Sequence, residues 1–309
     1  MRRAHPDGTA PSSAGLKIEE LKKRHMDTTT VAQQTRPERA AFDWLKTEET
    51  AVPMLPSVAL RVIELVSDPD VTVMSLAPVV SKDQVLASRV LGLGNSAAYA
   101  GYQPATTLLE AMVRLGTVAV RNVVVTVSFA SRMHDPRIYG EQGRHLVDHA
   151  IGTAYVARLL AERVKIDLEE AFMCGLMHDI GKLVILKLAY DHGRKTGKPA
   201  PPEEVQSAVD DRHAAFGGLT LKRWKLPESL IEPVTCHHDY TMAHTRKKEA
   251  AVCYAANQLA HRYGFGCESD GRNLLDDHVS TFLGLDEAWL NNADDRAPGL
   301  YDVARKVLS

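Results

Sequence analysis

A histidine and an aspartate stand side by side inside an otherwise apolar run, CGLMHDIGKLVI at residues 174–185. Imidazole nitrogen suits zinc, iron or nickel, and a carboxylate adds the negative charge that helps to hold a divalent cation. On a helix, adjacent side chains point about 100° apart, so one ion cannot easily take both His178 and Asp179. Two ions could, with Asp179 as a bridge, as two-metal hydrolytic sites require. The dyad is therefore a candidate metal site.

Further histidines occupy helical positions from which they could reach this dyad. A single histidine on an apolar helix face is usually a hydrogen-bonded core residue, and a His-His pair at a helix end often only balances the helix dipole. The metal hypothesis therefore rests on the whole set of candidate ligands. These are His149, His178, Asp179, His213, His237 and His238. The expected ion is a divalent metal: iron, manganese, zinc or nickel.

Two interpretations are open for Gly181 and Lys182, which follow the dyad. The pair could end the helix, since glycine is common at helix C-termini. Alternatively, the Lys182 ammonium could contact a phosphate group. We favour the helix end.

Apolar residues recur with helical spacing along most of the chain, which predicts an all-α fold. Neither an Asn-Gly hairpin between alternating strands nor a β-α alternation occurs. The β-branched run at 123–127 could form a strand, but its place between helical segments favours a buried helix. Residues 1–46 are polar and offer little apolar surface, so we expect a disordered lead.

Capping residues mark where several helices should begin. Ser57 is the expected N-cap of the first ordered helix. The pairs Ser81–Gln84 and Thr107–Glu110 have the spacing of capping boxes.

Three further segments are expected to position the candidate ligands. Gly116 should end one helix, and the next should begin at Thr117. Residues 145–164 form one amphipathic helix that carries His149. Residues 167–188 form a single helix through the dyad, with Asp167 and Glu170 as its cap pair.

Composition excludes some classes of protein. The 309 residues are 45% hydrophobic and carry a formal net charge of −2, so they lack the basic field that draws proteins onto nucleic acid. Apolar runs stay shorter than the ~18 residues of a membrane span, and the N-terminus has no apolar core of a signal peptide. The four cysteines show no C-x-x-C spacing, which favours free thiols in the cytoplasm.

The order of these motifs resembles the HD superfamily of metal-dependent phosphohydrolases and, more closely, the HDOD (HD-related output) domain. The similar stretches are LPSVALRVIELVSDPD, SKDQVLASRVLGLGNSAAY, LLEAMVRLGTVAVRNVVV, AFMCGLMHDIGKLVI and RHAAFGGLTLKRWKLPESLIEPVTCHHD. The resemblance implies an HDOD domain at 47–262, in which an N-terminal helical part (47–138) packs on an HD-like part (139–262). A C-terminal helical extension, 263–309, would follow. It also implies a bacterial, cytoplasmic regulatory module linked to signalling.

The chain departs from the enzymes of that superfamily at one ligand. HD hydrolases supply a late aspartate from the last core helix, and the matching position here is Asn257. A neutral amide should weaken or abolish metal binding. Asp210, Asp211 or Asp239 could compensate, although no pattern places them near the dyad. The segment after the double histidine, DYTMAHTRKKEA, lacks the Gly-Tyr-Pro signature of relatives that cleave cyclic di-GMP.

Three functions follow from these observations. The favoured one is a regulatory module that contacts a protein partner through its N-terminal helices and keeps a degenerate HD site that could still bind metal. The alternative is a metal-dependent phosphohydrolase that acts on a nucleotide or cyclic dinucleotide, with Lys182 on the phosphate. Nucleic-acid binding is disfavoured because the charge is near neutral.

Overall fold

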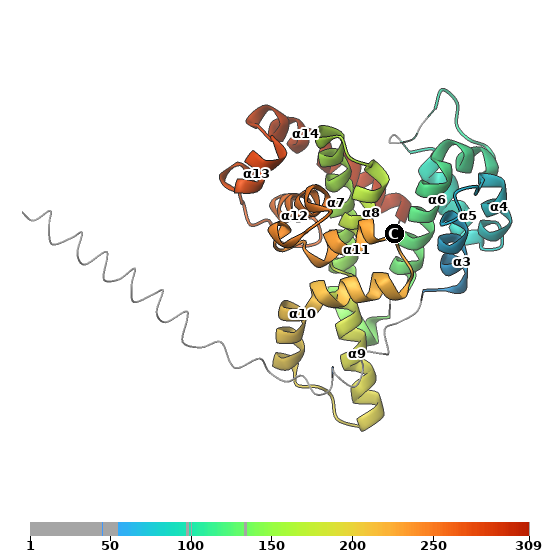
Figure 1. The fold of residues 1–309 in the computed structure, drawn as a ribbon. Helices are drawn as coiled ribbons and strands as arrows, with labels where there is room; N and C mark the ends of the chain where they lie inside the picture. The colour runs from blue at the N-terminus through green and yellow to red at the C-terminus, as the bar shows by residue number, and fades with distance from the viewer. Residues whose placement is uncertain (1–44, 46–54, 97–98, 100, 133–134, 309) are drawn as a thin grey trace, which may run out of the picture. The chain divides into compact units, whose positions relative to one another are not determined.

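A computed structural model describes residue 45 and residues 55–308, except for 97–98, 100 and 133–134. The described residues all belong to one compact unit, Asp43–Ser309. The predicted disordered lead therefore lies outside the described residues, apart from Leu45. Every regular element in the described part is a helix, which confirms the all-α prediction (Figure 1). No helix among these residues has the length and apolar character needed to cross a bilayer.

The described α-helices follow one another along the chain. In chain order they are α3 (Ser57–Val66), α4 (Val73–Val80), α5 (Gln84–Gly94), α6 (Leu108–Arg132), α7 (Pro136–Val164), α8 (Leu168–Met177), α9 (Ile180–Thr196), α10 (Pro202–Arg223), α11 (Glu228–Thr235), α12 (Lys247–Arg262), α13 (His278–Leu283) and α14 (Glu287–Leu308). Two short 3₁₀ helices, η2 (Tyr240–Met242) and η3 (Leu274–Asp276), flank α12.

One of the predicted capping boxes forms. The Glu110 amide donates to Thr107 Oγ1 at 3.2 Å, and the Glu110 carboxylate accepts from the Thr107 amide at 3.3 Å. The other box is wrong, because Asp83 caps α5 and Ser81 instead ends α4. The Asp83 carboxylate lies directly before the first turn and accepts two amide hydrogens there, so it outcompetes a more distant hydroxyl.

Ser57 is not an N-cap, since α3 begins at Ser57 itself after Pro56 and no side chain caps it. Gly116 divides α6 as predicted, with backbone angles of φ 78° and ψ 169°. The β-branched run at 123–127 lies in the second part of α6 and is buried, which confirms the buried helix.

The predicted single helix through the dyad is wrong. The chain leaves helical geometry at Asp179, with φ −100° and ψ 9°, so α8 ends before the dyad and α9 starts after it. Gly181 and Lys182 therefore lie in the first turn of α9, and the helix-end interpretation of this pair is also wrong. Asp167 caps α8 as expected by accepting from the Glu170 amide at 2.7 Å.

The Glu170 side chain does not complete that cap pair. Its carboxylate accepts a hydrogen bond from the Ser229 hydroxyl, 2.7 Å away on α11. A partner that is distant in the sequence thus takes the place of the local one, and the bond joins α8 to α11.

Helix α7 is the element against which the site is built. It packs against α8, α9, α12 and α14, and its C-terminal half shares an apolar core with α12 and α14. Helices α9 and α10 run side by side (Figure 1). The final segment of the chain forms the end of α14, which packs on α7. The histidines of the candidate site come from α7, the α8–α9 junction, α10 and the end of α11.

Candidate metal centre

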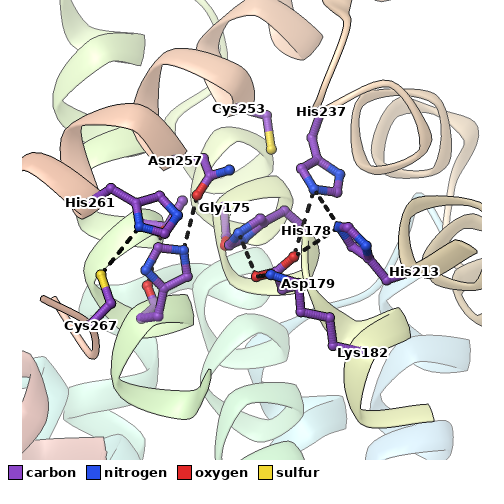
Figure 2. Close-up of polar contacts among 12 residues, drawn as sticks. Gly175, His178, Asp179, Lys182, His213, His237, Cys253, Asn257, His261 and Cys267 are labelled. Atoms are coloured by element: carbon purple, nitrogen blue, oxygen red, sulfur yellow. Dashed lines mark hydrogen bonds and ion pairs between the residues drawn. The ribbon is translucent and has the colours of Figure 1, made fainter. Parts of the chain in front are cut away.

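Asp179 lies at the centre of the candidate ligands (Figure 2). Its Oδ1 is 3.4 Å from His213 Nε2 and 3.7 Å from His237 Nε2. Its Oδ2 is 3.3 Å from His178 Nε2 and 2.6 Å from Lys182 Nζ. The structure thus brings together residues from three separate segments around one buried carboxylate.

The break between α8 and α9 allows both members of the dyad to face this cluster. His178 ends α8, and Asp179 precedes α9. A continuous helix would have pointed the two side chains about 100° apart. The change in chain direction removes the conflict, so Asp179 and His178 both contribute.

Gly181 sets the distance between α9 and α10. A Cβ atom added there would lie 1.8 Å from the His213 carbonyl oxygen, far inside van der Waals contact. Only glycine permits this approach. The close crossing places the His213 ring beside Asp179.

Four of the histidines use Nδ1 to bind a backbone carbonyl oxygen. The pairs are His149 with Phe265 at 3.0 Å, His178 with Gly175 at 2.8 Å, His213 with Val209 at 2.6 Å and His237 with Val234 at 2.6 Å. A carbonyl oxygen can only accept, so Nδ1 carries a proton in each ring, and in a neutral ring Nε2 then presents its lone pair. Metal-binding histidines are typically oriented by such a bond on the other ring nitrogen.

The protonation states of these groups suit a cation. Burial lowers the pKa of His149 to about 4, and it also lowers the pKa of His213 and His237. Burial alone would raise the pKa of Asp179, but its contacts with His178 and Lys182 hold that pKa well below its usual range. These histidines are thus neutral and the carboxylate is ionised at pH 7.

The donor atoms fit a divalent metal ion. Nε2 of His213 and Nε2 of His237 are 3.4 Å apart. Together with Asp179 Oδ1, they surround a point about 2 Å from each atom, which is the distance at which zinc binds imidazole nitrogen and carboxylate oxygen. His178 Nε2 and Asp179 Oδ1 are buried and form no hydrogen bond with any described residue. Buried polar atoms rarely lack a partner, and a bound cation would provide one for both His178 Nε2 and Asp179 Oδ1.

His238 lies at the rim of the cluster and is exposed. Its Nε2 is 2.7 Å from His213 Nε2, which is a hydrogen-bond distance. Because His213 Nε2 has only a lone pair, His238 must donate the proton. Partial burial of the ring against the cluster lowers the pKa of His238 to about 4, so this ring is neutral at pH 7. His238 therefore competes with an ion for the same lone pair of His213.

Asn257 occupies the place of the missing carboxylate. It is buried on α12, and its Oδ1 lies 3.0 Å from His149 Nε2. Since the proton of neutral His149 is on Nδ1, Nε2 can only accept a hydrogen bond. A half-turn of the amide brings Nδ2 to the same place, and its NH₂ then donates to the ring. The lone pair of His149 is thus held by an amide, although a ring nitrogen of His149 also lies within 4.8 Å of donor atoms of His178 and Asp179.

The aspartates that could compensate for Asn257 do not reach the cluster. Asp210 and Asp211 are exposed on α10 and accept bonds from side chains one turn earlier. Asp239 is exposed and accepts from the amide and hydroxyl of Thr241. Asp179 is therefore the one carboxylate that the described residues supply to this centre.

A cleft of about 250 Å³ borders the centre at Lys182. Polar side chains of Gln142, His145, Gln206 and Asp210 line it. Lys182 contacts Asp179 and also lines the cleft, so its ammonium group stands between the buried carboxylate and solvent. A phosphate group in the cleft would meet this ammonium.

Two residues beside His149 were not predicted from the sequence. His261 lies one helical turn after Asn257 on α12, and its ring centroid is 4.6 Å from that of His149. His261 could have been predicted, because residues four apart on a helix share a face and His261 lies four residues after Asn257. Cys267 lies in the loop after α12, 3.3 Å from His261. No local pattern marks it, because the loop brings it there.

Two relatives are similar to part of this chain in sequence. A protein from Treponema pallidum without assigned function is 26% identical over 222 residues, which are 69% of this chain and 42% of that protein. Ribonuclease Y from Symbiobacterium thermophilum is 28% identical over 118 residues, 38% of this chain and 18% of the enzyme. The chain therefore spans less than half the length of these relatives.

Solved structures share the fold. A candidate metal-dependent phosphohydrolase from Shewanella amazonensis SB2B has a TM-score of 0.68 at 20% identity, covering 86% of this chain and 96% of its own. An HDOD domain protein of unknown function from Geobacter sulfurreducens has a TM-score of 0.65 at 21% identity, covering 86% and 97%. A candidate signal transduction protein from Marinobacter aquaeolei VT8 has a TM-score of 0.63 at 19% identity, covering 93% and 65%. The HDOD domain matches residues 52–240, well over half of the sequence, and the chain belongs to the HDOD domain family.

Proposed function

We propose that the chain is an HDOD signalling module that acts by contact with a protein partner and holds a divalent cation at the dyad as a structural pin. The proposed ligands are Asp179, His178, His213 and His237. The main support for this proposal is the neutral amide of Asn257 at the position where HD hydrolases have an aspartate. It leaves a single carboxylate in the cluster, whereas hydrolytic two-metal sites need more negative charge to hold both ions.

A bound ion would tie together elements that are distant in the sequence. The ligands come from the α8–α9 junction, α10 and the end of α11. An ion that binds only the folded state adds about 2.7 kcal/mol of stability at a hundred times its dissociation constant. The histidine-rich donor set fits zinc, iron or nickel better than magnesium.

The N-terminal helices are the part that we assign to the protein partner. Several apolar side chains are exposed there, namely Met74 on α4, Val85 on α5, and Leu109 and Val113 on α6. Leu109 and Val113 are one turn apart and therefore share a face of α6. This pair of neighbouring exposed apolar side chains is the surface that we assign to the partner.

The cleft beside Lys182 favours a second candidate, a metal-dependent phosphohydrolase acting on a nucleotide or cyclic dinucleotide. A bound divalent cation would polarise a phosphoryl oxygen and lower the pKa of a water molecule. Lys182 would bind the phosphate from the cleft, and this requires its ammonium to exchange the Asp179 contact for the substrate. The name of the Shewanella protein is compatible with this candidate.

Two measurements on the purified full chain separate the candidates. Elemental analysis gives the metal content of the wild type and of His213→Ala, and a phosphodiesterase assay with and without added metal gives turnover. The signalling module predicts bound metal that decreases in His213→Ala, and no metal-dependent turnover. Turnover of a cyclic dinucleotide or nucleotide that is lost in His213→Ala would establish the hydrolase instead. Absence of metal after loading with manganese, iron and zinc would refute both versions.

A further inference from the structure

A second group of metal-binding side chains lies beside the Asp179 centre. Figure 2 shows Cys267 and His261 on one side of Asn257, and the dyad on the other. The Cys267 sulfur is 3.3 Å from His261 Nδ1. The His261 ring in turn lies against His149, with 4.6 Å between the ring centroids. One nitrogen of each histidine and the sulfur all lie within 4.8 Å of one another.

The separation of Cys267 and His261 suits two ligands of one tetrahedral ion. Zinc binds thiolate sulfur at about 2.3 Å and imidazole nitrogen at about 2.0–2.1 Å, which sets these two donors about 3.5 Å apart. The distance between Cys267 Sγ and His261 Nδ1 is close to that value. Thiolate is a soft ligand and selects zinc over magnesium, calcium or manganese.

The loop that carries Cys267 is built against His149. Gly266 has a φ of 67°, and a Cβ there would lie 2.2 Å from the His145 carbonyl oxygen and 2.4 Å from the His149 amide nitrogen. Phe265 accepts the hydrogen bond from His149 Nδ1 and stacks on Tyr301 of α14, with 4.2 Å between the ring centroids. The loop therefore holds Cys267 in place and orients the ring of His149 with the same contacts.

Helix α12 contributes one side chain beside the Asp179 centre and another to the cluster with Cys267. Asn257 offers the dyad a neutral amide, and His261 one turn later offers an imidazole to Cys267. A bound metal would displace the proton of the Cys267 thiol, and the resulting thiolate would supply the negative charge that Asn257 cannot.

We propose that His149, His261 and Cys267 form a second, soft metal site that takes zinc and leaves Asp179 to its own centre. This site does not depend on the proposed function, because two of its three ligands lie outside the dyad cluster. In this arrangement a metal replaces the Asn257 amide on His149, and the fourth position is open to solvent or to a small ligand.

Cobalt(II) is the probe that tests this site. Tetrahedral cobalt bound to a thiolate gives an intense sulfur-to-metal charge-transfer band in the near ultraviolet, which ligation by nitrogen and oxygen alone does not give. Titration of the metal-free full chain with cobalt should produce this band, and zinc should abolish it by displacement. Cys267→Ser should remove the band, and His261→Ala should weaken cobalt binding about tenfold or more.

Two variants keep the result interpretable. Cys236→Ser is the matched control, since Cys236 is also a half-buried free thiol, and it should retain the band. The double variant Asp179→Asn, His213→Ala should lose metal at the dyad and keep the band. Thermal melting of metal-free Cys267→Ser, compared with metal-free wild type, checks that the variant folds. The proposal is overturned if the fully loaded wild type has no band, if Cys267→Ser keeps it, or if Cys236→Ser loses it.

Discussion

Asn257 meets the ring of His149 at 3.0 Å, on the Nε2 atom that would otherwise face the dyad. A neutral amide can donate a hydrogen bond to that lone pair, whereas an ionised carboxylate cannot. The hydrogen bond between Asn257 and His149 therefore determines whether His149 Nε2 is available as a metal ligand.

The first prediction follows from this pair. Asn257→Asp should strengthen divalent metal binding at the dyad by about 10–100-fold, because the carboxylate adds charge and frees His149 as a ligand. Competition titration against a metal indicator measures the change. Asn257→Ala is the control, since it frees the ring without adding charge and should gain much less. Equal affinity of the aspartate variant and the wild type would contradict the role assigned to the amide.

The crossing of α9 and α10 makes Gly181 a sensitive position. Gly181→Ala should destabilise the fold by about 3 kcal/mol, since the methyl group would overlap the His213 carbonyl oxygen and force the helices apart. Chemical denaturation measures the free energy of unfolding. Gly299→Ala on α14 is the matched control. No described atom lies within 4 Å of its added Cβ, so it should be neutral or gain up to about 1 kcal/mol from helix propensity. Similar results for both variants would refute the close crossing.

Lys182 is a cation that neutralises Asp179 in the absence of metal. Lys182→Met should therefore raise metal affinity at the dyad severalfold, because the ion no longer competes with the ammonium group. The same variant should lose binding of inorganic phosphate if the cleft accepts it. Isothermal titration calorimetry with zinc and with phosphate measures both. Lys187→Met, which removes a lysine paired with Asp191 on the same helix, should change neither.

Buried neutral histidines predict a stability that depends on pH. The folded pKa of His149 is about 4, below the ordinary value near 6.5, so between these values the unfolded chain binds more protons. The stability contributed by His149 is therefore complete above about pH 6.5 and is lost as the pH falls towards 4. The loss is on the order of 3 kcal/mol for a shift of this size.

Urea denaturation of the metal-free protein between pH 7 and pH 4.5 measures this loss. His149→Gln should flatten the pH dependence, whatever its effect on stability at pH 7. A pH dependence as steep in this variant as in the wild type would assign the effect to other groups.

The sequence by itself determined the helical class and the identity of most candidate ligands. The β-branched run at 123–127 was predicted to be helical because the segments on both sides of it have helical periodicity, and the structure confirms a buried helix there. The Thr107–Glu110 cap and the break at Gly116 were also readable, since each depends only on residues within one turn. Asn257 was recognisable as a departure because a resemblance supplied the expected residue.

Tertiary structure decided the features that depend on contacts between distant segments. The helix breaks at Asp179, where the carboxylate lies beside His213 from α10 and His237 from the turn after α11, and such contacts between distant segments have no signature in the local sequence. The Glu170 carboxylate likewise accepts a hydrogen bond from Ser229, which is distant in the sequence, and so does not complete the predicted cap pair. The loop at 264–267 carries Cys267 to His261 through glycine backbone angles and packing on α7. Spacing along the chain thus identifies which side chains can do chemistry, and packing of helices decides which of them meet.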